Sequence, residues 1–564
     1  MADYFVHYPT PIDEVIGIAG ELVRHARDGN TTIGRIRQDM GRATDAVDGT
    51  LRFPMEVAPH PVEVTVGNVA NAAYFASGAM MLFAQAVKTY NNGVDGINAQ
   101  IHDDERGLDP GGPAGKLQEL EAQRARYEQA LDDEAARVAR MLERGPNEED
   151  MRFLRDHGFL LPLDPSTDPA LRAALARRPK LGDPAAMRRW WAGLTLAQQA
   201  GLIAYYPKLL GNANGLPAEV RDEANRLVLD EDYNWLKARE RDGELTPEQA
   251  RALKNIEKVR EQLKVRATHV DPITGQPVPV QLYIYDPYAF GGEGRVAIAT
   301  GNLDDADHVA LMVPGVGSSV QGLLPRRPGE LYDESRWAGG GDSVAVLDWM
   351  GYDSPNGYTP GNLDSAGLLN QDMARAGAQQ LVSDVSGLRA SRSDDPAHLT
   401  VIGSSYGSTT AGIAATPEYG LDADDLVLSA SPGVPVDDAG DLGTGHDHTW
   451  VGSATDDPIT QFGDSGWDGT GMPAPLGNDP AEDTFGANRF RAEDVQREDW
   501  PAVPSFDPHG RYFNHDSESL YNMGAIVTGQ YGDVQAADPR YDPWYAPEQD
   551  PEADRNPEHL HHKP

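Results

Sequence analysis

The sequence predicts an α/β fold, a doubly wound and mostly parallel sheet, preceded by an all-helical N-terminal region. Three observations support this prediction. Residues 11–145 carry apolar side chains at three- and four-residue spacing, which is the period of amphipathic helices. After Thr268 the apolar residues instead form short continuous runs, as in strands that are buried on both faces. A helical run over residues 370–388 separates two of these runs, and such alternation predicts a doubly wound sheet.

Length and composition limit the class of protein. At 564 residues the chain is too long for one core, so we expect two or more domains. A hydrophobic content of 40% and a charged content of 24% are typical of a soluble globular protein. The net charge of -40 argues against nucleic acid and anionic membranes as partners, because both would be repelled. Without cysteine the chain forms no disulfide, thiolate zinc site or cysteine nucleophile, and we expect no cofactor and no metal.

The sequence predicts no Sec signal and no membrane span. The N-terminus lacks a basic stretch followed by an apolar one, so no Sec signal is expected. Residues 69–87 form the most apolar stretch, and a buried, alanine-rich helix is favoured there over a membrane span. The reason is that four residues interrupt the apolar run, namely Asn71, Ser77, Gly78 and Gln85. We expect a cytoplasmic protein by default, with a type VII-like export as the alternative.

Residues 1–150 are predicted to form a domain of long helices. One apolar face runs from Ile12 to Ala26, and a second long helix covers residues 62–101. A third helix repeats apolar residues at 3.5-residue spacing, namely Leu117, Leu120, Tyr127, Leu131, Val138 and Met141. Two long antiparallel helices joined by a short break resemble, in shape only, the hairpins of WXG100-type substrates of type VII secretion, since no W-x-G marks the turn. The helices are expected to bind a protein partner, and they contain no recognisable catalytic arrangement.

Residues 151–267 are predicted to form a helical linker or cap. Asp183-Pro184 is an N-cap followed by proline at the first helical position, and Thr246 opens a capping box. One helix of this segment carries a polar face, and we expect that face to tie the segment to the next domain as a structural network. Its members are Arg221, Asp222, Asn225 and Arg226.

Residues 268–547 are predicted to form the α/β domain and residues 548–564 a disordered acidic tail. The tail is rich in proline, glutamate, aspartate and histidine without periodicity. Its histidines, His559, His561 and His562, are not expected to bind a metal. The strand candidates of the domain are residues 278–285, 295–300, 308–313, 343–347, 399–402, 426–430 and 449–453.

The sequence G-S-S-Y-G at Gly403–Gly407 contains the motif G-x-S-x-G. It follows a short apolar run and precedes a stretch of small, helix-compatible residues, so it lies on a predicted strand-to-helix turn. Such a turn would expose Ser405 at the carboxyl end of the sheet as a nucleophile. An ordinary strand-to-helix turn in a chain with 59 glycines would show the same pentapeptide, so the assignment depends on its partners.

A serine nucleophile needs a base, and the base needs an acid that orients it. When the nucleophile lies on such a turn, the partners follow in the order serine, acid, histidine. Asp457 follows the strand candidate 449–453 and is our candidate acid, with Asp456 as the alternative.

His509 is the candidate base, because it lies on a late loop before the predicted helix 517–527. His515, six residues later, is the alternative. His446 and His448 precede the acid, and the order of the chain excludes them.

An oxyanion hole needs two N–H groups that point at the reacting oxygen. The residue after the nucleophile, Tyr406, provides one of them. The glycine-rich loop after the third strand candidate, M-V-P-G-V-G-S-S, provides the other, from Val316 or Gly317. A loop that merely connects a strand to a helix would look the same.

From about residue 190 to residue 529 the chain resembles an actinobacterial family of α/β-hydrolases once catalogued as a domain of unknown function, DUF1023. The resemblance rests on many segments, among them WWAGLTLAQQAGLIAYYPKLLGNANGLPAEVRDEANR, VPGVGSS, DWMGYDSP, TVIGSSYGSTT, SASPGV, DDPIT, FGANRF and HGRYF. It implies an α/β-hydrolase fold with Ser405 as nucleophile, His509 as base and Asp457 as acid. One departure is Ser404, which stands where such hydrolases often carry histidine.

The leading hypothesis is a serine hydrolase that cleaves an ester, thioester or amide through an acyl-enzyme, with a small-molecule or lipid-like acyl substrate. A carboxylic ester is the first choice. The alternative is a non-catalytic α/β scaffold whose helical half mediates partner binding or export. A lyase or transferase that reuses the same three residues is a third hypothesis.

Overall fold

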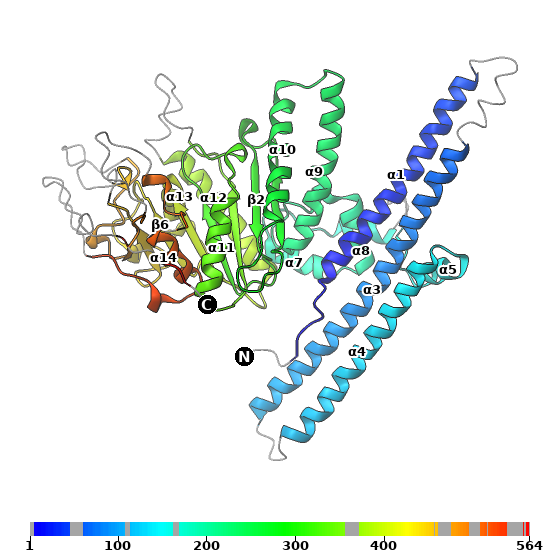
Figure 1. Ribbon diagram of the computed structural model, residues 1–564, viewed down its shortest axis with the longest axis horizontal. Helices are drawn as coiled ribbons and strands as arrows, with labels where there is room; N and C mark the ends of the chain where they lie inside the picture. The colour runs from blue at the N-terminus through cyan, green and yellow to red at the C-terminus, as the bar shows by residue number, and fades with distance from the viewer. Residues whose placement is uncertain are drawn as a thin grey trace. The chain divides into compact units, whose positions relative to one another are not determined.

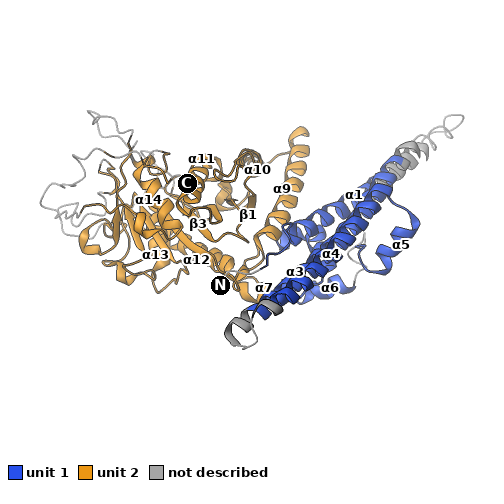
Figure 2. Cartoon of the chain, turned by 60° about the horizontal axis from the view of Figure 1, so that its bottom comes forward, with its two compact units in different colours: residues 1–179, 189–210 blue, residues 180–188, 211–564 orange. Residues whose placement is uncertain are grey.

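The computed structural model describes residues 5–45, 60–107, 113–161, 169–355, 371–455, 457–460, 475–495, 508–515, 517–538, 557 and 560–562. The chain divides into two compact units, shown blue and orange in Figure 2. Unit 1 comprises Met1–Pro179 and Arg189–Leu210, and unit 2 comprises Lys180–Arg188 and Gly211–Pro564. The predicted segment 151–267 is therefore divided between the units, and its residues 211–267 belong with the sheet.

Unit 1 is helical, as predicted (Figure 1). Its long helices are α1 (Ile12–Asp45), α3 (His60–Gly107) and α4 (Pro113–Arg144). Shorter helices are α5 (Glu148–Asp156), α6 (Pro169–Ala176) and α8 (Leu196–Tyr205), and α7 (Pro184–Ala192) crosses the boundary between the units in the sequence.

The predicted apolar faces of α1 and α4 are buried inside unit 1. Burial of such a face is the main source of stability for an amphipathic helix. No helix in the described part of the chain is long and apolar enough to cross a membrane. The buried residues of the two faces are Val15, Ile16, Ala19, Val23 and Ala26 in α1, and Leu120, Leu131, Val138 and Met141 in α4.

Unit 2 contains an eight-stranded sheet in the order β1-β2-β4-β3-β5-β6-β7-β8. β1 and β2 are antiparallel to each other, β2 is antiparallel to β4, and the remaining neighbours are parallel. The mostly parallel sheet is thus confirmed. The strands are β1 (Val280–Asp286), β2 (Arg295–Thr300), β3 (His308–Val313), β4 (Val344–Met350), β5 (His398–Ser404), β6 (Asp425–Ser429), β7 (Thr449–Gly452) and β8 (Asn488–Phe490).

Helices cover both faces of the sheet (Figure 1). One face packs against α12 (Asp372–Ser391) and α13 (Tyr406–Ala415). The other face packs against α11 (Arg326–Ala338) and α14 (Glu518–Val527). At the β1–β2 edge, α9 (Ala218–Arg241) and α10 (Pro247–Arg266) bury their apolar faces. The sheet is therefore doubly wound, and its strands are buried on both sides.

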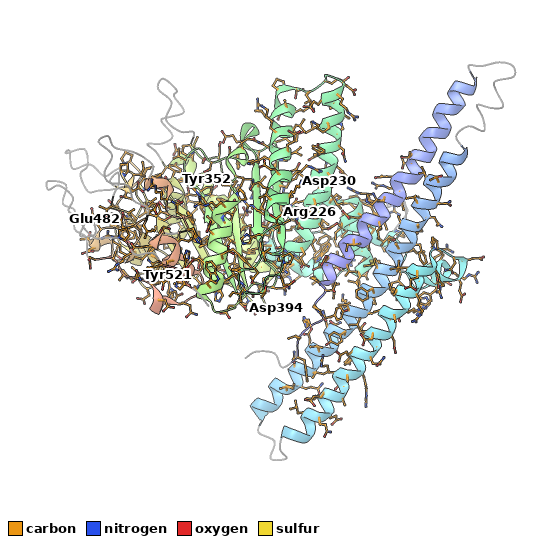
Figure 3. The ribbon with its side chains drawn as sticks, in the orientation of Figure 1. Arg226, Asp230, Tyr352, Asp394, Glu482 and Tyr521 are labelled. Atoms are coloured by element: carbon orange, nitrogen blue, oxygen red, sulfur yellow. The ribbon has the colours of Figure 1, made fainter. Side chains whose placement is uncertain are left out.

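The polar face on α9 joins this helix to β1, as predicted. Asn225 donates to the Leu282 carbonyl at 2.9 Å, and Asp222 accepts from the Leu282 N–H at 2.5 Å. Arg226, labelled in Figure 3, donates to the Val280 carbonyl at 2.7 Å. These side chains satisfy backbone groups of an edge strand, which would otherwise remain unpaired.

The end of the chain differs from the predicted disordered tail at His561 and His562. Both histidines contact the carboxylate of Glu334 on α11, at 2.7 and 2.9 Å. The His562 ring also stacks on Tyr521 of α14. Glu334 is 1% exposed, and a buried carboxylate requires hydrogen-bond donors, which these two residues supply.

Asp425 joins the amino-terminal ends of the parallel strands. Its carboxylate is fully buried and accepts four hydrogen bonds from side chains. The donors are His398 at 2.7 Å, His448 at 3.0 Å, Trp450 at 2.9 Å and Tyr531 at 2.7 Å. Burial acts to raise the pKa of Asp425, but these hydrogen bonds outweigh burial and hold the pKa below its ordinary value.

We expect Asp425→Ala to lower the free energy of unfolding by about 3 kcal/mol, because it leaves the buried Trp450 N–H and three partly buried donors without their acceptor. The lowered pKa makes the Asp425 contribution complete above about pH 4 and lost as the pH falls through the folded value. Thermal unfolding between pH 3 and pH 7 tests both points, with Asp422→Ala as the exposed control. A Tm for Asp425→Ala equal to that of the control would show that the network does not stabilise the sheet.

Candidate active site

Ser405 lies on a sharp turn between β5 and α13. β5 ends at Ser404 and α13 begins at Tyr406, so a single residue connects strand and helix. Ser405 has φ 55° and ψ -133°, a conformation that costs a non-glycine residue on the order of 1–3 kcal/mol. The turn leaves the Ser405 side chain at the carboxyl end of the parallel sheet.

The two glycines of the motif are required by close packing. A Cβ on Gly403 would lie 2.6 Å from Ser408 Cα, and one on Gly407 would overlap the Val313 carbonyl. Because real Cβ atoms do not approach so closely, neither position accepts another residue without moving the backbone. The absent side chains let β5, α13 and β3 approach one another around Ser405.

Ser405, His509 and Asp457 form a continuous chain of hydrogen bonds. The Ser405 hydroxyl lies 2.8 Å from His509 Nε2, inside the range expected for a nucleophile and its base. The opposite nitrogen, Nδ1, lies 2.8 and 3.0 Å from the two carboxylate oxygens of Asp457. The structure thus brings together the three residues that the order of the sequence selected.

Asp457 is fully buried and held by its neighbours. Its Oδ1 accepts from the Ile459 N–H at 2.9 Å, and its Oδ2 accepts from the Tyr512 hydroxyl at 3.0 Å. Burial, and next the negative charge of Asp457, raise the pKa of Tyr512 well above its ordinary value. Tyr512 therefore stays protonated and donates to the acid, a role that the sequence pattern did not indicate.

The loop after β3 packs directly against Ser405. A Cβ on Gly315 would lie 3.1 Å from Ser405 Oγ, so the absence of a side chain brings this backbone beside the reacting atom. The Gly317 N–H donates to the Pro355 carbonyl at 2.8 Å. Of the two predicted donors, Gly317 is therefore already engaged. Val316 lines the cavity at Ser405, and its N–H donates to no acceptor within the described residues.

The alternative base, His515, and the two histidines excluded by chain order lie elsewhere. His515 contacts Glu330 at 2.9 Å with a half-exposed side chain, His446 contacts Asp438, and His448 belongs to the Asp425 network. The alternative acid, Asp456, lies outside the described residues. Within the described ranges, no group of three or more histidine, aspartate or glutamate side chains could hold a metal ion.

A cavity of about 970 Å³ opens at Ser405. Its volume is at the upper end of the range for small-molecule sites, about 300–1,000 Å³. Most of its lining is apolar, including Met312, Met350, Ile402, Leu324, Ile459, Leu476 and Phe513. His509 and two charged side chains, Asp348 and Arg327, also line it. The arrangement presents a hydroxyl, a base and an acid at one place in a largely apolar chamber.

Comparisons with known proteins agree with this architecture. A family model described as alpha/beta hydrolase matches residues 290–465, which include the nucleophile turn and Asp457. "Uncharacterized protein Rv2079" of Mycobacterium tuberculosis is 33% identical over 487 residues, covering 77% of this chain and 71% of the relative. "Uncharacterized protein Rv0963c" of the same organism is 27% identical over 173 residues, covering 29% of this chain and 61% of the relative.

Two solved esterase structures show weaker likenesses. A hyperthermophilic esterase from Pyrobaculum calidifontis is 14% identical, with 51% of this chain and 92% of that chain covered and a TM-score of 0.25. Carboxyl esterase 2 from Tuber melanosporum is 13% identical, with 52% and 100% covered and a TM-score of 0.26. Scores this low leave both likenesses without weight for the fold or the function.

The long match to Rv2079, together with the family model over the sheet and the nucleophile turn, shows the family. The chain belongs to the α/β-hydrolase family.

Proposed function

We propose that the protein is a serine hydrolase that cleaves an ester, thioester or amide through an acyl-enzyme, with carboxylic esters as its first class of substrate. One observation carries the proposal. The Ser405 hydroxyl, His509 and buried Asp457 form a hydrogen-bonded chain that opens into a largely apolar cavity. The apolar lining favours a small-molecule or lipid-like acyl substrate.

Acylation begins with attack of Ser405 Oγ on the substrate carbonyl. His509 Nε2 takes the hydroxyl proton as the bond to carbon forms, and the resulting imidazolium is stabilised by Asp457 at Nδ1. The same proton then passes from Nε2 to the leaving oxygen, sulfur or nitrogen as the bond to that atom breaks. The first product departs, and an acyl group remains on Ser405.

Deacylation repeats these steps with water. His509 takes a proton from water, and the hydroxide oxygen bonds to the acyl carbon. Nε2 then returns the proton to Ser405 Oγ as the acid product leaves. In both halves, negative charge develops on the former carbonyl oxygen, and we assign the N–H groups of Tyr406 and Val316 to it. Two observations support this assignment: Gly315 packs beside Ser405 Oγ, and the next residue, Val316, lines the cavity.

Ser405→Ala should lower kcat for a short p-nitrophenyl ester by roughly 10⁴-fold or more. It should also abolish covalent labelling by a fluorophosphonate. The control is Ser393→Ala, an exposed serine after α12, which should keep wild-type labelling and turnover. If the folded wild-type protein neither labels nor hydrolyses any ester, thioester or amide offered, the chain is a non-catalytic scaffold whose N-terminal helices bind a partner.

Tyr512→Phe removes the hydroxyl that donates to Asp457 and accepts from the Ala454 N–H at 2.9 Å, so it tests how Asp457 is positioned. We expect kcat to fall by about 10- to 100-fold, because a hydrogen bond to a charged group is lost, with KM nearly unchanged. For Asp457→Asn, kcat should fall further, by about 10⁴-fold, because the imidazole loses the charge that orients it. Steady-state kinetics, with Tyr419→Phe as the control, measures the effects on kcat and on KM separately. A change in KM alone for Tyr512→Phe would place Tyr512 in substrate binding instead.

A further inference from the structure

The floor of the cavity carries one carboxylate among apolar side chains. Side chains alternate along β4, so that Leu347 and Trp349 enter the core on the α12 and α13 side. Asp348 and Met350 point to the opposite face and line the cavity. Asp348 is 7% exposed, and its exposed part belongs to the cavity that contains Ser405.

Asp348 is held from below by Arg266 at the end of α10. Arg266 Nη2 donates to Asp348 Oδ2 at 2.5 Å, and the Arg266 side chain is 1% exposed. The second oxygen, Oδ1, accepts no hydrogen bond from any residue that the structure describes. Oδ1 is open to the cavity rather than buried, and a ligand in the cavity could donate a hydrogen bond to it.

Stability alone does not explain this ion pair. Replacing a buried ion pair by apolar residues of similar volume is often neutral or stabilising. The neighbouring strands place Met312 and Ile402 in register with Asp348, and both are apolar and line the same cavity. A leucine at position 348 would continue that surface. The carboxylate is therefore better explained by what the cavity accommodates.

The sheet register sets the separation between Asp348 and the nucleophile. Asp348 lies two strands from Ile402 at the same level, and Ser405 is three residues beyond Ile402. Strand spacing of about 4.8 Å and a rise of about 3.3 Å per residue give roughly 14 Å between the two backbone positions. An extended chain of medium length, attached to the reacting carbonyl, spans that distance.

Charge selects the group at the far end of that chain. The Arg266 guanidinium neutralises Asp348, and a second guanidinium, Arg327, lines the same cavity. A cationic end group would be repelled by both arginines, and an anionic one has no proton to donate to Oδ1. A neutral hydroxyl donates a hydrogen bond to Oδ1 without bringing a charge.

We propose that Asp348 determines specificity by accepting a hydrogen bond from a hydroxyl at the far end of the substrate. The substrate class is then a hydroxylated ester of medium chain length, with the hydroxyl on either the acyl arm or the alcohol arm. This inference rests on the proposed serine hydrolase activity at the same cavity, and it identifies the substrate more closely.

The test uses full-length protein and matched pairs of substrates. One series compares p-nitrophenyl alkanoates with their ω-hydroxy counterparts, and a second compares acetate esters of alcohols with those of the corresponding diols. In one of the two series, kcat/KM should favour the hydroxylated member by about tenfold or more at medium chain length. Equal values or a preference for the plain chain in both series would overturn the inference, and so would a preference for an ω-carboxylate.

A double variant tests whether Asp348 causes the preference for hydroxylated substrates. Arg266→Met with Asp348→Leu removes the pair without leaving a buried charge, and should reduce the hydroxyl preference to about one or below. The matched control replaces another buried pair, Arg295 and Asp384 at 2.6 Å, by Arg295→Met with Asp384→Leu. It should keep the wild-type preference, and a preference retained in the first variant would exclude Asp348.

The two proposals fail in different ways. Each preference is a ratio within one protein, so a general loss of activity does not change it, and the wild-type ratio decides even if a variant does not fold. Hydrolysis without hydroxyl preference contradicts only the role of Asp348. Absence of hydrolysis for all substrates, including short p-nitrophenyl esters, contradicts the serine hydrolase itself.

Discussion

The conformation of Ser405 is the constraint on which the rest of the site depends. Its positive φ is imposed by a strand that ends one residue before a helix begins. The turn requires β3, β5 and α13 to pack closely against one another. Glycine at positions 403 and 407 makes this packing possible, because a side chain there would collide with the neighbouring backbone. Burial of the sheet on both faces supplies the free energy that maintains the strained residue. Asp457 and His509 then need only loops that reach the carboxyl end of the same strands.

Much of this arrangement could be predicted from the sequence, because it depends on local pattern and chain order. The strands 295–300 and 308–313 were predicted with their observed ends, since continuous apolar runs identify strands buried on both faces. Ser405 follows from the motif on such a strand. Asp457 and His509 follow from the chain order serine, acid, histidine, with each residue on a loop at the carboxyl end of the parallel strands. The observed hydrogen bonds join the residues that this order selects.

The remaining features depend on tertiary contacts that have no local pattern. β8 is three residues long and too short to show a period. The Gly317 N–H is occupied by Pro355, 38 residues later, so composition could not separate it from Val316. Tyr512 and Asp348 have ordinary neighbours in sequence, and only the fold brings one to Asp457 and the other to the cavity. His561 and His562 were assigned to a disordered tail because no nearby residue indicates a partner for them. Their partner, Glu334, lies 227 positions before His561.

If the proposed mechanism holds, Ser405 becomes covalently acylated during turnover. Rapid mixing with a p-nitrophenyl ester, followed by acid quenching and peptide mass spectrometry, measures this directly. We expect the peptide that contains Ser405 to gain the mass of the acyl group at the rate of the p-nitrophenolate burst. Turnover accompanied by an acyl group on a different residue, or by no acylated peptide at any quench time, would contradict it.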